Sequence, residues 1–411
     1  TDAIDGGSGS DTVRLTAATV FGSGVTFAGV EVLDIGAGLA ASLFGPQVNA
    51  FTTVAGGAGA SLTVNTASGG TFVLGELGFA NLTVTHVGAG GNEAITGASV
   101  AESLSGLAGN DTLAGGGGND TLLGGAGADS LSGGTGDDLF VYAAAGESGV
   151  GEAIDGGTGT NTVSLTAAID MTGATFTNIQ AVTIGSGLTG TFSGSQLTGQ
   201  TFTRSGVNGG AVETLVVNVA SGTTTDLTSL GTISDLTVQI NGAAGNENIT
   251  GSAASESLSG LAGNDTLAGG GGNDTLLGGA GNDSLSGGTG DDLFVYAAAG
   301  ESGVGEAVDG GTGTNTVSLT AAVDMTGATF ANIQAVTIGS GLTGTFSGSQ
   351  LTGQTFTMSG VSSGAVETLV VNVASGTTAD LSNLGTISDL TVQINGAAGN
   401  ENITGSAASE S

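Results

Sequence analysis

Gly106-Leu-Ala-Gly-Asn-Asp111-Thr-Leu113 opens the run of nine-residue repeats that decides the fold of this chain. It is followed by Gly115-Gly-Gly-Gly-Asn-Asp120-Thr-Leu122, Gly124-Gly-Ala-Gly-Ala-Asp129-Ser-Leu131 and Gly133-Gly-Thr-Gly-Asp-Asp138-Leu-Phe140. Each repeat has glycines at fixed offsets, an acidic residue at its sixth position and an apolar residue at its eighth. The same pattern returns later in the chain, with the acidic residues Asp265, Asp274, Asp283 and Asp292.

The chemistry of each repeat indicates a turn that binds a hard cation. Glycine adopts the positive φ angles of tight turns and leaves the turn carbonyls accessible, and carboxylate oxygens are ligands that calcium prefers in sets of six to eight. The three remaining residues, as in Thr112-Leu113-Ala114, have room for a short strand with an inward central side chain. Two nonapeptides then close a coil of eighteen residues, so Asp111 stacks on Asp129, and Asp120 on Asp138.

This tandem G-G-x-G-x-D-x-U-x pattern resembles the repeats-in-toxin (RTX) family of calcium-binding proteins. In the RTX β-roll, carboxylates and turn carbonyls of stacked turns share calcium, so the resemblance implies several Ca²⁺ ions for each block of repeats. Carried over residue by residue, the predicted ligands are Asp111, Asp120, Asp129, Asp138, Asp265, Asp274, Asp283 and Asp292. The same nine-residue spacing adds Glu93, Glu102, Glu247 and Glu256, of which Glu93 and Glu102 lack the full set of glycines.

A longer period of 154 residues is superimposed on the nonapeptides. Asn110 matches Asn264, and Gly245-Asn-Glu-Asn-Ile-Thr250 returns at Gly399-Asn-Glu-Asn-Ile-Thr404. We therefore expect a tandem array that is part of a longer protein. The predicted order is a diverged β-helix segment (1–90), RTX block 1 (91–141), a linker and β-helix segment (142–244), RTX block 2 (245–295), a second linker and β-helix segment (296–398) and the start of a third block (399–411).

The segments between the blocks are rich in Thr, Val, Leu and Gly, and their short apolar runs predict strands. Leu215-Val-Val-Asn-Val219 and Leu236-Thr-Val-Gln-Ile240 are separated by turn-forming residues, and no helical period is sustained. Apolar residues return every 18 to 19 positions, close to the coil length of the nonapeptides. The predicted fold is all-β: a parallel β-solenoid in which β-roll blocks alternate with β-helix segments, with separate β-sandwich domains as the alternative.

Composition and charge limit the partners of the chain. With 83 glycines, one proline and 4% aromatic residues, an ordinary globular core is excluded, whereas a solenoid of thin stacked coils fits. The formal charge of −34, with Arg14 and Arg204 as the only Lys or Arg residues, opposes binding to nucleic acid or anionic membranes. Membrane insertion is not expected, since no run of 18 apolar residues occurs. Without calcium the stacked carboxylates repel one another, so we expect the blocks to fold only when calcium binds.

The sequence offers no convincing catalytic residues, and we predict no enzymatic activity for it. His86 is the only histidine, and Ile240 and Ile394 occupy the equivalent positions in the other copies. A G-x-S-x-G string ends at Gly364, but its sister copy has Asn208 in place of Ser362, which favours a loop. An enzyme domain elsewhere in a longer protein remains compatible with this prediction.

Isolated nonapeptides outside the blocks carry an amide in place of the acid. Asn161 and Asn315 hold the sixth position of Gly156-Gly-Thr-Gly-Thr-Asn161-Thr-Val163 and of its copy, while the relative near the start carries Asp11. A side-chain amide oxygen can bind calcium but contributes no charge. We expect weak sites or plain turns here.

Two functions are compatible with a calcium-dependent array of near-identical repeats. The chain resembles giant RTX surface proteins and bacterial surface-layer proteins, which implies type I secretion, an extracellular or cell-surface location and self-association into sheets or filaments. The favoured interpretation is a structural component of a surface layer or matrix fibre. The alternative is the stalk of a large RTX adhesin involved in biofilm formation or surface attachment.

Overall fold

The structure is a computed structural model that describes residues 2–74, 78–145, 147, 151–199, 203–206, 211–230, 233–234, 236–298, 301, 305–361 and 365–405. The chain divides into two compact units. Unit 1 comprises Thr1–Thr191, Thr201–Thr214 and Gly231–Leu236, and unit 2 comprises Phe192–Gln200, Leu215–Leu230 and Thr237–Ser411. Each unit contains one of the two predicted RTX blocks.

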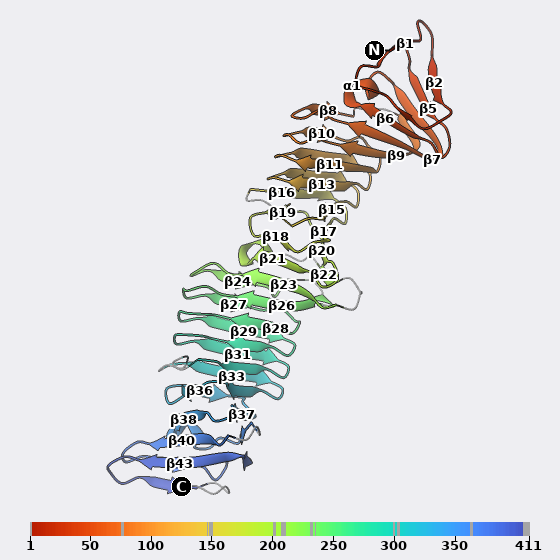
Figure 1. Cartoon of the computed structure of the whole chain (residues 1–411). Coiled ribbons are helices and arrows are strands. Elements are labelled where there is room, and N and C mark those ends of the chain that lie inside the picture. The colour runs from red at the N-terminus through yellow and green to blue at the C-terminus, as the bar shows by residue number, and fades with distance from the viewer. Residues whose placement is uncertain are drawn as a thin grey trace. The chain divides into compact units, whose positions relative to one another are not determined.

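Unit 1 is built around a parallel sheet whose strands come from successive coils (Figure 1). In spatial order these strands are β2 (Thr12–Leu15), β5 (Val32–Ile35), β7 (Thr53–Asn65), β9 (Gly78–Val87), β11 (Glu102–Ala108), β13 (Thr121–Ala126), β15 (Leu139–Tyr142), β17 (Thr162–Leu165), β20 (Ala181–Ile184), β22 (Thr203–Gly206) and β25 (Ile233–Ser234). The short strands β3 (Thr19–Val20) and β6 (Ala40–Phe44) join this sheet beside β7. The sheet therefore runs through block 1 and through the segments on both sides of it.

A second parallel sheet supplies the other strand of each coil in unit 1. Its members are β8 (Thr71–Val73), β10 (Ala94–Thr96), β12 (Thr112–Gly117), β14 (Ser130–Thr135), β16 (Ala153–Thr158) and β19 (Thr175–Thr177). β1 (Ala3–Asp5) and β4 (Thr26–Ala28) form a two-stranded parallel sheet, and β18 (Ile169–Asp170) pairs in parallel with β21 (Thr189–Ser193) at one end of an 11-stranded sheet.

Unit 2 repeats this arrangement around block 2. Its first sheet follows β23 (Glu213–Asn218), β26 (Leu236–Asn241), β28 (Glu256–Ser259), β30 (Thr275–Leu277), β32 (Leu293–Tyr296), β34 (Thr316–Leu319), β37 (Ala335–Ile338), β39 (Thr357–Gly360) and β42 (Ile387–Ser388). Its second follows β24 (Thr224–Asp226), β27 (Asn248–Thr250), β29 (Thr266–Gly271), β31 (Ser284–Thr289), β33 (Ala307–Thr312) and β36 (Thr329–Ala331). Smaller parallel sheets contain β35 (Val323–Asp324), β38 (Thr343–Ser347), β40 (Glu367–Val373) and β43 (Leu390–Gly396), and β41 (Thr378–Asp380) with β44 (Asn402–Thr404).

The core of each coil is a stack of apolar side chains in register. Leu113 pairs with Leu131, and Leu131 pairs with Ile154 in the next coil. On the other sheet, Leu104 pairs with Leu122 and Leu122 with Phe140; all of these residues are at most 2% exposed. A fully buried Leu or Phe contributes about 1.5–3 kcal/mol, and stacking adds one such contribution per strand. The predicted parallel β-solenoid is confirmed, and the β-sandwich alternative is wrong.

The coils of the segments are longer than the eighteen residues of the blocks. The register advances by 18 residues from Thr112 to Ser130, but by 23 from Ser130 to Ala153. In unit 2 it advances by 25 from Thr343 to Thr368. The expected coil length of 18 to 19 residues was therefore too short for the segments. The sequence period reflects the buried side chains of neighbouring strands, and residues that loop out at the corners do not contribute to it.

One-turn helices form corners that the sequence pattern did not reveal. They are α1 (Gly45–Val48), α2 (Gly194–Leu197) and α3 (Gly348–Leu351). In α1 the Gln47 side chain accepts a 2.7 Å hydrogen bond from the Phe44 N–H and donates at 2.8 Å to the Gly22 and Val25 carbonyls. Four residues are too few to produce a helical period, so a glutamine, buried in α1 and half-buried in α2 and α3, fixes these corners instead. None of the helices in the described part of the chain is long and apolar enough to cross a membrane.

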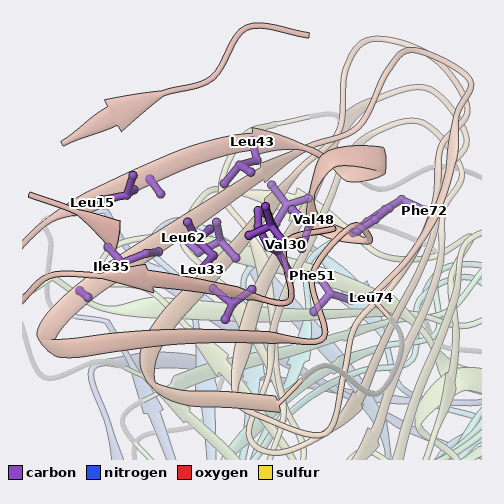
Figure 2. Packing of buried hydrophobic residues seen from close by; sticks show 14 residues of the cluster. Leu15, Val30, Leu33, Ile35, Leu43, Val48, Phe51, Leu62, Phe72 and Leu74 are labelled. Carbon is purple, nitrogen blue, oxygen red and sulfur yellow. The ribbon is translucent and has the colours of Figure 1, made fainter. Parts of the chain in front are cut away.

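The diverged first segment contains a hydrophobic cluster (Figure 2). Leu33, Ile35, Leu43, Leu62 and Val48 are inaccessible to solvent, and the short helix α1 closes one end of the cluster. The segment is therefore packed around the same kind of stacked aliphatic core as the blocks.

Candidate metal centre

The sixth-position acids lie at the corners of the coils, each immediately before a strand. Asp111 precedes β12, and Asp120 precedes β13. Although they belong to turns, these carboxylates are turned inward. The eight aspartates are each 1–2% exposed: Asp111, Asp120, Asp129, Asp138, Asp265, Asp274, Asp283 and Asp292. Buried carboxylates require compensation by hydrogen bonds or cations, so the partners of the two oxygens decide what these corners can do.

One oxygen of each carboxylate accepts a hydrogen bond from the backbone of the coil before it. The Asp111 Oδ1 accepts a 2.7 Å hydrogen bond from the backbone N–H of Glu93, eighteen residues earlier. Asp129 accepts in the same way from Asp111 at 2.7 Å, and Asp138 from Asp120 at 2.8 Å. Block 2 repeats the pattern, with Asp283 accepting from Asp265 at 2.8 Å and Asp292 from Asp274 at 2.9 Å. The predicted stacking of the acids is therefore present as a direct hydrogen-bonded series.

The second oxygen is buried and has no hydrogen-bond donor among the described residues. This holds for Oδ2 of all eight aspartates. An ionised oxygen in this state costs several kilocalories per mole unless a cation or a proton reaches it. The pattern is the same in both blocks, so it is a property of the repeat.

A backbone carbonyl faces the same space as this second oxygen. A Cβ atom on Gly106 would overlap both Asp111 Oδ2 and the carbonyl oxygen of Gly124 in the following coil. Gly115 stands in the same relation to Asp120 Oδ2 and the Gly133 carbonyl. At the corners of Asp111, Asp120, Asp265 and Asp274, the first glycine of the repeat thus keeps open a cradle lined by two oxygens from successive coils. Two oxygens that face each other without a proton between them fit a hard cation such as calcium.

Burial and neighbouring charge both act against ionisation of the aspartates in the metal-free protein. Burial raises the pKa of Asp111 to about 6, and the charges of Asp129 and Glu93 add to this shift. Burial, followed by the charges of Glu102 and Asp138, raises the pKa of Asp120 to about 7. In block 2 burial likewise raises the pKa of Asp265 and of Asp274 to about 6. A bound divalent cation would reverse this balance by favouring the carboxylate form.

The four glutamates have different surroundings from the aspartates. Both carboxylate oxygens of Glu93 accept backbone hydrogen bonds, from Gly69 at 2.7 Å and Ala89 at 3.2 Å. Glu247 is held in the same way by Gly222 at 2.7 Å and Ala243 at 3.1 Å. The longer side chain reaches back to N–H groups of its own and the neighbouring turn, so these first steps of each ladder are satisfied without a metal.

The second glutamate of each ladder has a buried side-chain partner. Glu102 Oε1 lies 3.4 Å from His86 Nε2, and both residues are buried. In block 2 the Ser252 hydroxyl donates to Glu256 Oε1, and burial raises the pKa of Glu256 to about 8. Their other oxygens lie near carbonyls of the next coil but already accept backbone hydrogen bonds, from Ala98 at 2.7 Å and from Ser252 at 3.3 Å. These two corners therefore differ from the aspartate cradles, because neither carboxylate oxygen is without a partner.

The cradles combine one carboxylate with main-chain oxygens. In the described part of the chain no group of three or more His, Cys, Asp or Glu side chains is placed to hold a metal ion. The acids of one edge follow each other at one per coil, so main-chain carbonyls must complete any calcium coordination sphere here. This is the mixed ligand set that the repeat pattern implies.

Further buried acids lie at corners of the segments and were not predicted. Glu152 is aligned with Asp129, since Ser130 pairs with Ala153, and its carboxylate accepts a hydrogen bond from the Tyr142 hydroxyl. Unit 2 has the equivalent pair Glu306 and Tyr296, at 2.5 Å. Glu213 and Glu367, each 3% exposed, are also at corners. They lack the glycines of the nonapeptide, but all four precede a buried aliphatic residue by two positions. A search for this spacing alone, without the glycines, would have identified them.

Of the two positions considered for catalysis, His86 and Ser362, the structure describes His86 alone. His86 is fully buried and its Nδ1 has no partner among the described residues. The G-x-S-x-G string falls at residues 360–364, of which 362–364 lie outside the described residues.

Comparison with known proteins agrees with the geometry of the corners. The family model of the RTX calcium-binding nonapeptide repeat (4 copies) matches residues 104–140, 241–276 and 259–294. No curated protein matches the chain. The matched residues carry the buried aspartates with an unpartnered Oδ2, and RTX repeats are typical of secreted, calcium-binding proteins. Both blocks of the chain therefore carry RTX calcium-binding nonapeptide repeats, built into a parallel β-solenoid.

Proposed function

We propose that the chain is an extracellular structural repeat protein, a component of a surface layer or matrix fibre, whose β-rolls fold and associate on binding calcium. The observation that carries this proposal is the row of eight buried Asp Oδ2 atoms without a hydrogen-bond donor. A fold that places charged oxygens in this way is incomplete until cations occupy the corners. Calcium binding would therefore be coupled to folding.

In this proposal the eight aspartates are the principal ligands, together with main-chain carbonyls such as those that face Asp111, Asp120, Asp265 and Asp274. Glu102 and Glu256 would contribute less, because each has one oxygen beside a buried side chain and the other on a backbone N–H. Glu93 and Glu247 would also contribute less, because both of their oxygens already accept backbone hydrogen bonds. Several ions per block would result.

The coupling of calcium to folding favours a location outside the cell. At the submicromolar calcium of a cytosol the carboxylates of adjacent coils repel one another, and the net charge of −34 adds a general repulsion. At millimolar calcium the same carboxylates become cross-links between coils. A chain that is unfolded before export and folds outside would suit type I secretion and a bacterial cell surface.

Self-association is supported by the repetition of exposed groups. Leu107 and Leu261, at the second position of the first full nonapeptide of each block, are 49% and 54% exposed. They lie 154 residues apart in near-identical surroundings. A periodic array of identical apolar groups on an acidic surface favours contacts with further copies of the array once calcium has neutralised the corners.

The alternative function is the stalk of a large adhesin, and a specific observation supports it. The main sheet of unit 1 passes through block 1 and the flanking segments without a change of strand direction. Such a unit supplies extension and stiffness without needing lateral partners. A ligand-binding domain elsewhere in a longer protein would then determine what is attached.

Negative-stain electron microscopy of the chain, purified in chelator and then given millimolar calcium, separates the two functions. Ordered sheets or filaments that dissolve in chelator would support the structural role, and isolated particles would favour the stalk. Circular dichroism on the same samples tests the folding step on its own. An unchanged β signal in chelator would refute calcium-coupled folding. Magnesium at the same concentration is the control for simple charge neutralisation.

A further inference from the structure

Asn161 and Asn315 occupy the corner that follows the last aspartate on one edge of each block. Asp138 is aligned with Asn161, because Leu139 pairs with Thr162. The backbone N–H of Asp138 donates a 3.0 Å hydrogen bond to Asn161 Oδ1, as it would to an aspartate in a nonapeptide ladder. Asp292 donates to Asn315 Oδ1 at 2.9 Å. The hydrogen bond that Oδ1 accepts from the preceding coil in the aspartate corners is therefore preserved at both positions.

The other terminal atom of the side chain differs, because it is an N–H donor where an aspartate has an oxygen. Asn161 Nδ2 donates a 3.1 Å hydrogen bond to the carbonyl oxygen of Asn178, and a Cβ atom on Gly156 would overlap both atoms. This is the cradle in which Asp111 Oδ2 faces the Gly124 carbonyl, with an N–H in place of one oxygen. Since Oδ1 is fixed by the N–H of Asp138, the amide group can only direct its nitrogen at the carbonyl.

Unit 2 contains the same arrangement. Asn315 Nδ2 donates to the Asn332 carbonyl at 3.1 Å, beside Gly310. Both asparagines are fully buried. Their own backbone N–H groups donate to amide oxygens, those of Gln180 at 2.7 Å and Gln334 at 2.6 Å. These corners are satisfied entirely by neutral groups.

The diverged first segment shows the same corner with acids in place of the amides. Asp11 stands where the copies have Asn161, and its N–H donates at 2.8 Å to Glu31, the counterpart of Gln180. There, Asp11 Oδ2 has no hydrogen-bond donor among the described residues, and a Cβ on Gly6 would overlap the Gly29 carbonyl. The same backbone thus accepts either an acid or an amide, and only the amide satisfies the carbonyl by itself.

We infer that, at Asn161 and Asn315, an amide hydrogen bond takes the place of a calcium ion. The coils that bear these residues therefore close without metal, and the calcium ladders end at Asp138 and Asp292. The sixth residue then determines whether a corner requires a cation. A carboxylate needs a divalent ion to bridge Oδ2 and the carbonyl, whereas a carboxamide supplies the bridging proton. This inference rests on the proposed role of the aspartates as ligands.

Bound calcium per chain in the Asn161→Asp variant tests the inference, measured by elemental analysis after dialysis of the full 411-residue chain at millimolar calcium. We expect one additional ion. Ala168→Asp is the matched control: it adds the same charge at an exposed side chain that takes no part in the corner, and no additional ion is expected. An unchanged count in Asn161→Asp would overturn the inference.

The reverse substitution, Asp120→Asn, covers the case in which Asn161→Asp does not fold. We expect one ion fewer, with the coil retained, because the new amide donates to the Gly133 carbonyl. A lower count in Asp120→Asn together with an unchanged count in Asn161→Asp would overturn the inference but leave the proposed ligands standing. An unchanged count in Asp120→Asn would overturn both.

Hydrogen exchange in chelator gives a readout that does not depend on counting ions. In the wild-type chain we expect the amides of β17, which follows Asn161, to exchange more slowly than those of β13, which follows Asp120. In Asn161→Asp this protection should fall at least tenfold in chelator and return with calcium. Equal exchange of β13 and β17 in the wild-type chain without calcium would contradict the inference.

Discussion

The backbone N–H of Asp111 donates a 2.7 Å hydrogen bond to the carboxylate of Asp129, one coil further along the chain. The backbone N–H of each predicted aspartate ligand thus donates to the side chain one coil further along, and its carboxylate accepts from the backbone N–H one coil earlier. The side chain that is expected to bind the ion also fixes the corner before it.

Truncation of one of these side chains should therefore cost both binding and folding. We expect Asp129→Ala to leave the buried N–H of Asp111 without its acceptor, a loss of about 1–3 kcal/mol, and to remove a ligand. The calcium concentration at the midpoint of folding, followed by circular dichroism, should rise several-fold. Asp170→Ala is a suitable control, because Asp170 is exposed and its carboxylate accepts hydrogen bonds from the nearby Thr172 alone among the described residues. Equal midpoints for the two variants would argue against the role of Asp129.

Acid should stabilise the metal-free protein. The pKa of Asp120 is raised to about 7 and that of Asp111 to about 6, above the usual 3.8, so the folded state binds more protons than the unfolded state between these values. Stability in chelator must then fall as pH rises from about 4 to 7. Urea unfolding in chelator should show greater stability at pH 5 than at pH 7.5.

The opposite pH dependence is expected for calcium. Ions must displace the protons that the buried carboxylates hold, so calcium titrations at pH 5 should show weaker binding than at pH 7.5. A chelator-treated chain that is more stable at pH 7.5 than at pH 5 would mean that the aspartates are not buried in the metal-free state.

The first glycine of the repeat should be sensitive to a single methyl group. Gly106→Ala places a Cβ where Asp111 Oδ2 and the Gly124 carbonyl converge, so we expect loss of calcium binding at this corner and a lower melting temperature with calcium. Gly90→Ala is the matched control, since nothing lies within 4 Å of a Cβ at that position. Comparable melting of the two variants would show that the cradle is not used.

Leu107 should tolerate, and gain from, replacement by glycine. Its φ of 79° lies in the left-handed region, and the following coil has Gly125 at the aligned position. The left-handed conformation costs a non-glycine residue about 1–2 kcal/mol, partly offset by the greater freedom of glycine in the unfolded chain. We expect Leu107→Gly to raise the free energy of unfolding with calcium by up to about 1 kcal/mol.

The same substitution tests self-association independently of stability. If exposed Leu107 and Leu261 contribute to contacts between copies, the double variant Leu107→Gly with Leu261→Gly should fold with calcium but form fewer or no assemblies. The buried Leu122→Ala is the contrasting change, with an expected loss of about 2–5 kcal/mol. Assembly of the double glycine variant at the wild-type calcium concentration would exclude this surface.

The block corners were predictable because glycine spacing and burial of Leu113 and Leu131 impose the same period on sequence and structure. Glu152 and Glu213 were missed because their corners do not use the glycine set. The length of the segment coils was underestimated for a related reason: residues looped out at a corner leave no periodic signal. The contrast between Asp111 and Asn161 needed coordinates, since only the direction of Nδ2 toward the Asn178 carbonyl shows what the amide does.

The placement of Asp111 between the N–H of Glu93 and the carbonyl of Gly124 ties three successive coils to one side chain. We expect an ion bound there to strengthen the corner before it and the corner after it, and so to raise the affinity of the neighbouring sites. Calcium loading of a block should consequently be cooperative, with a Hill coefficient above one. A longer run of aspartate corners would respond to calcium over a narrower range of concentration, and an amide corner would limit how far that response spreads.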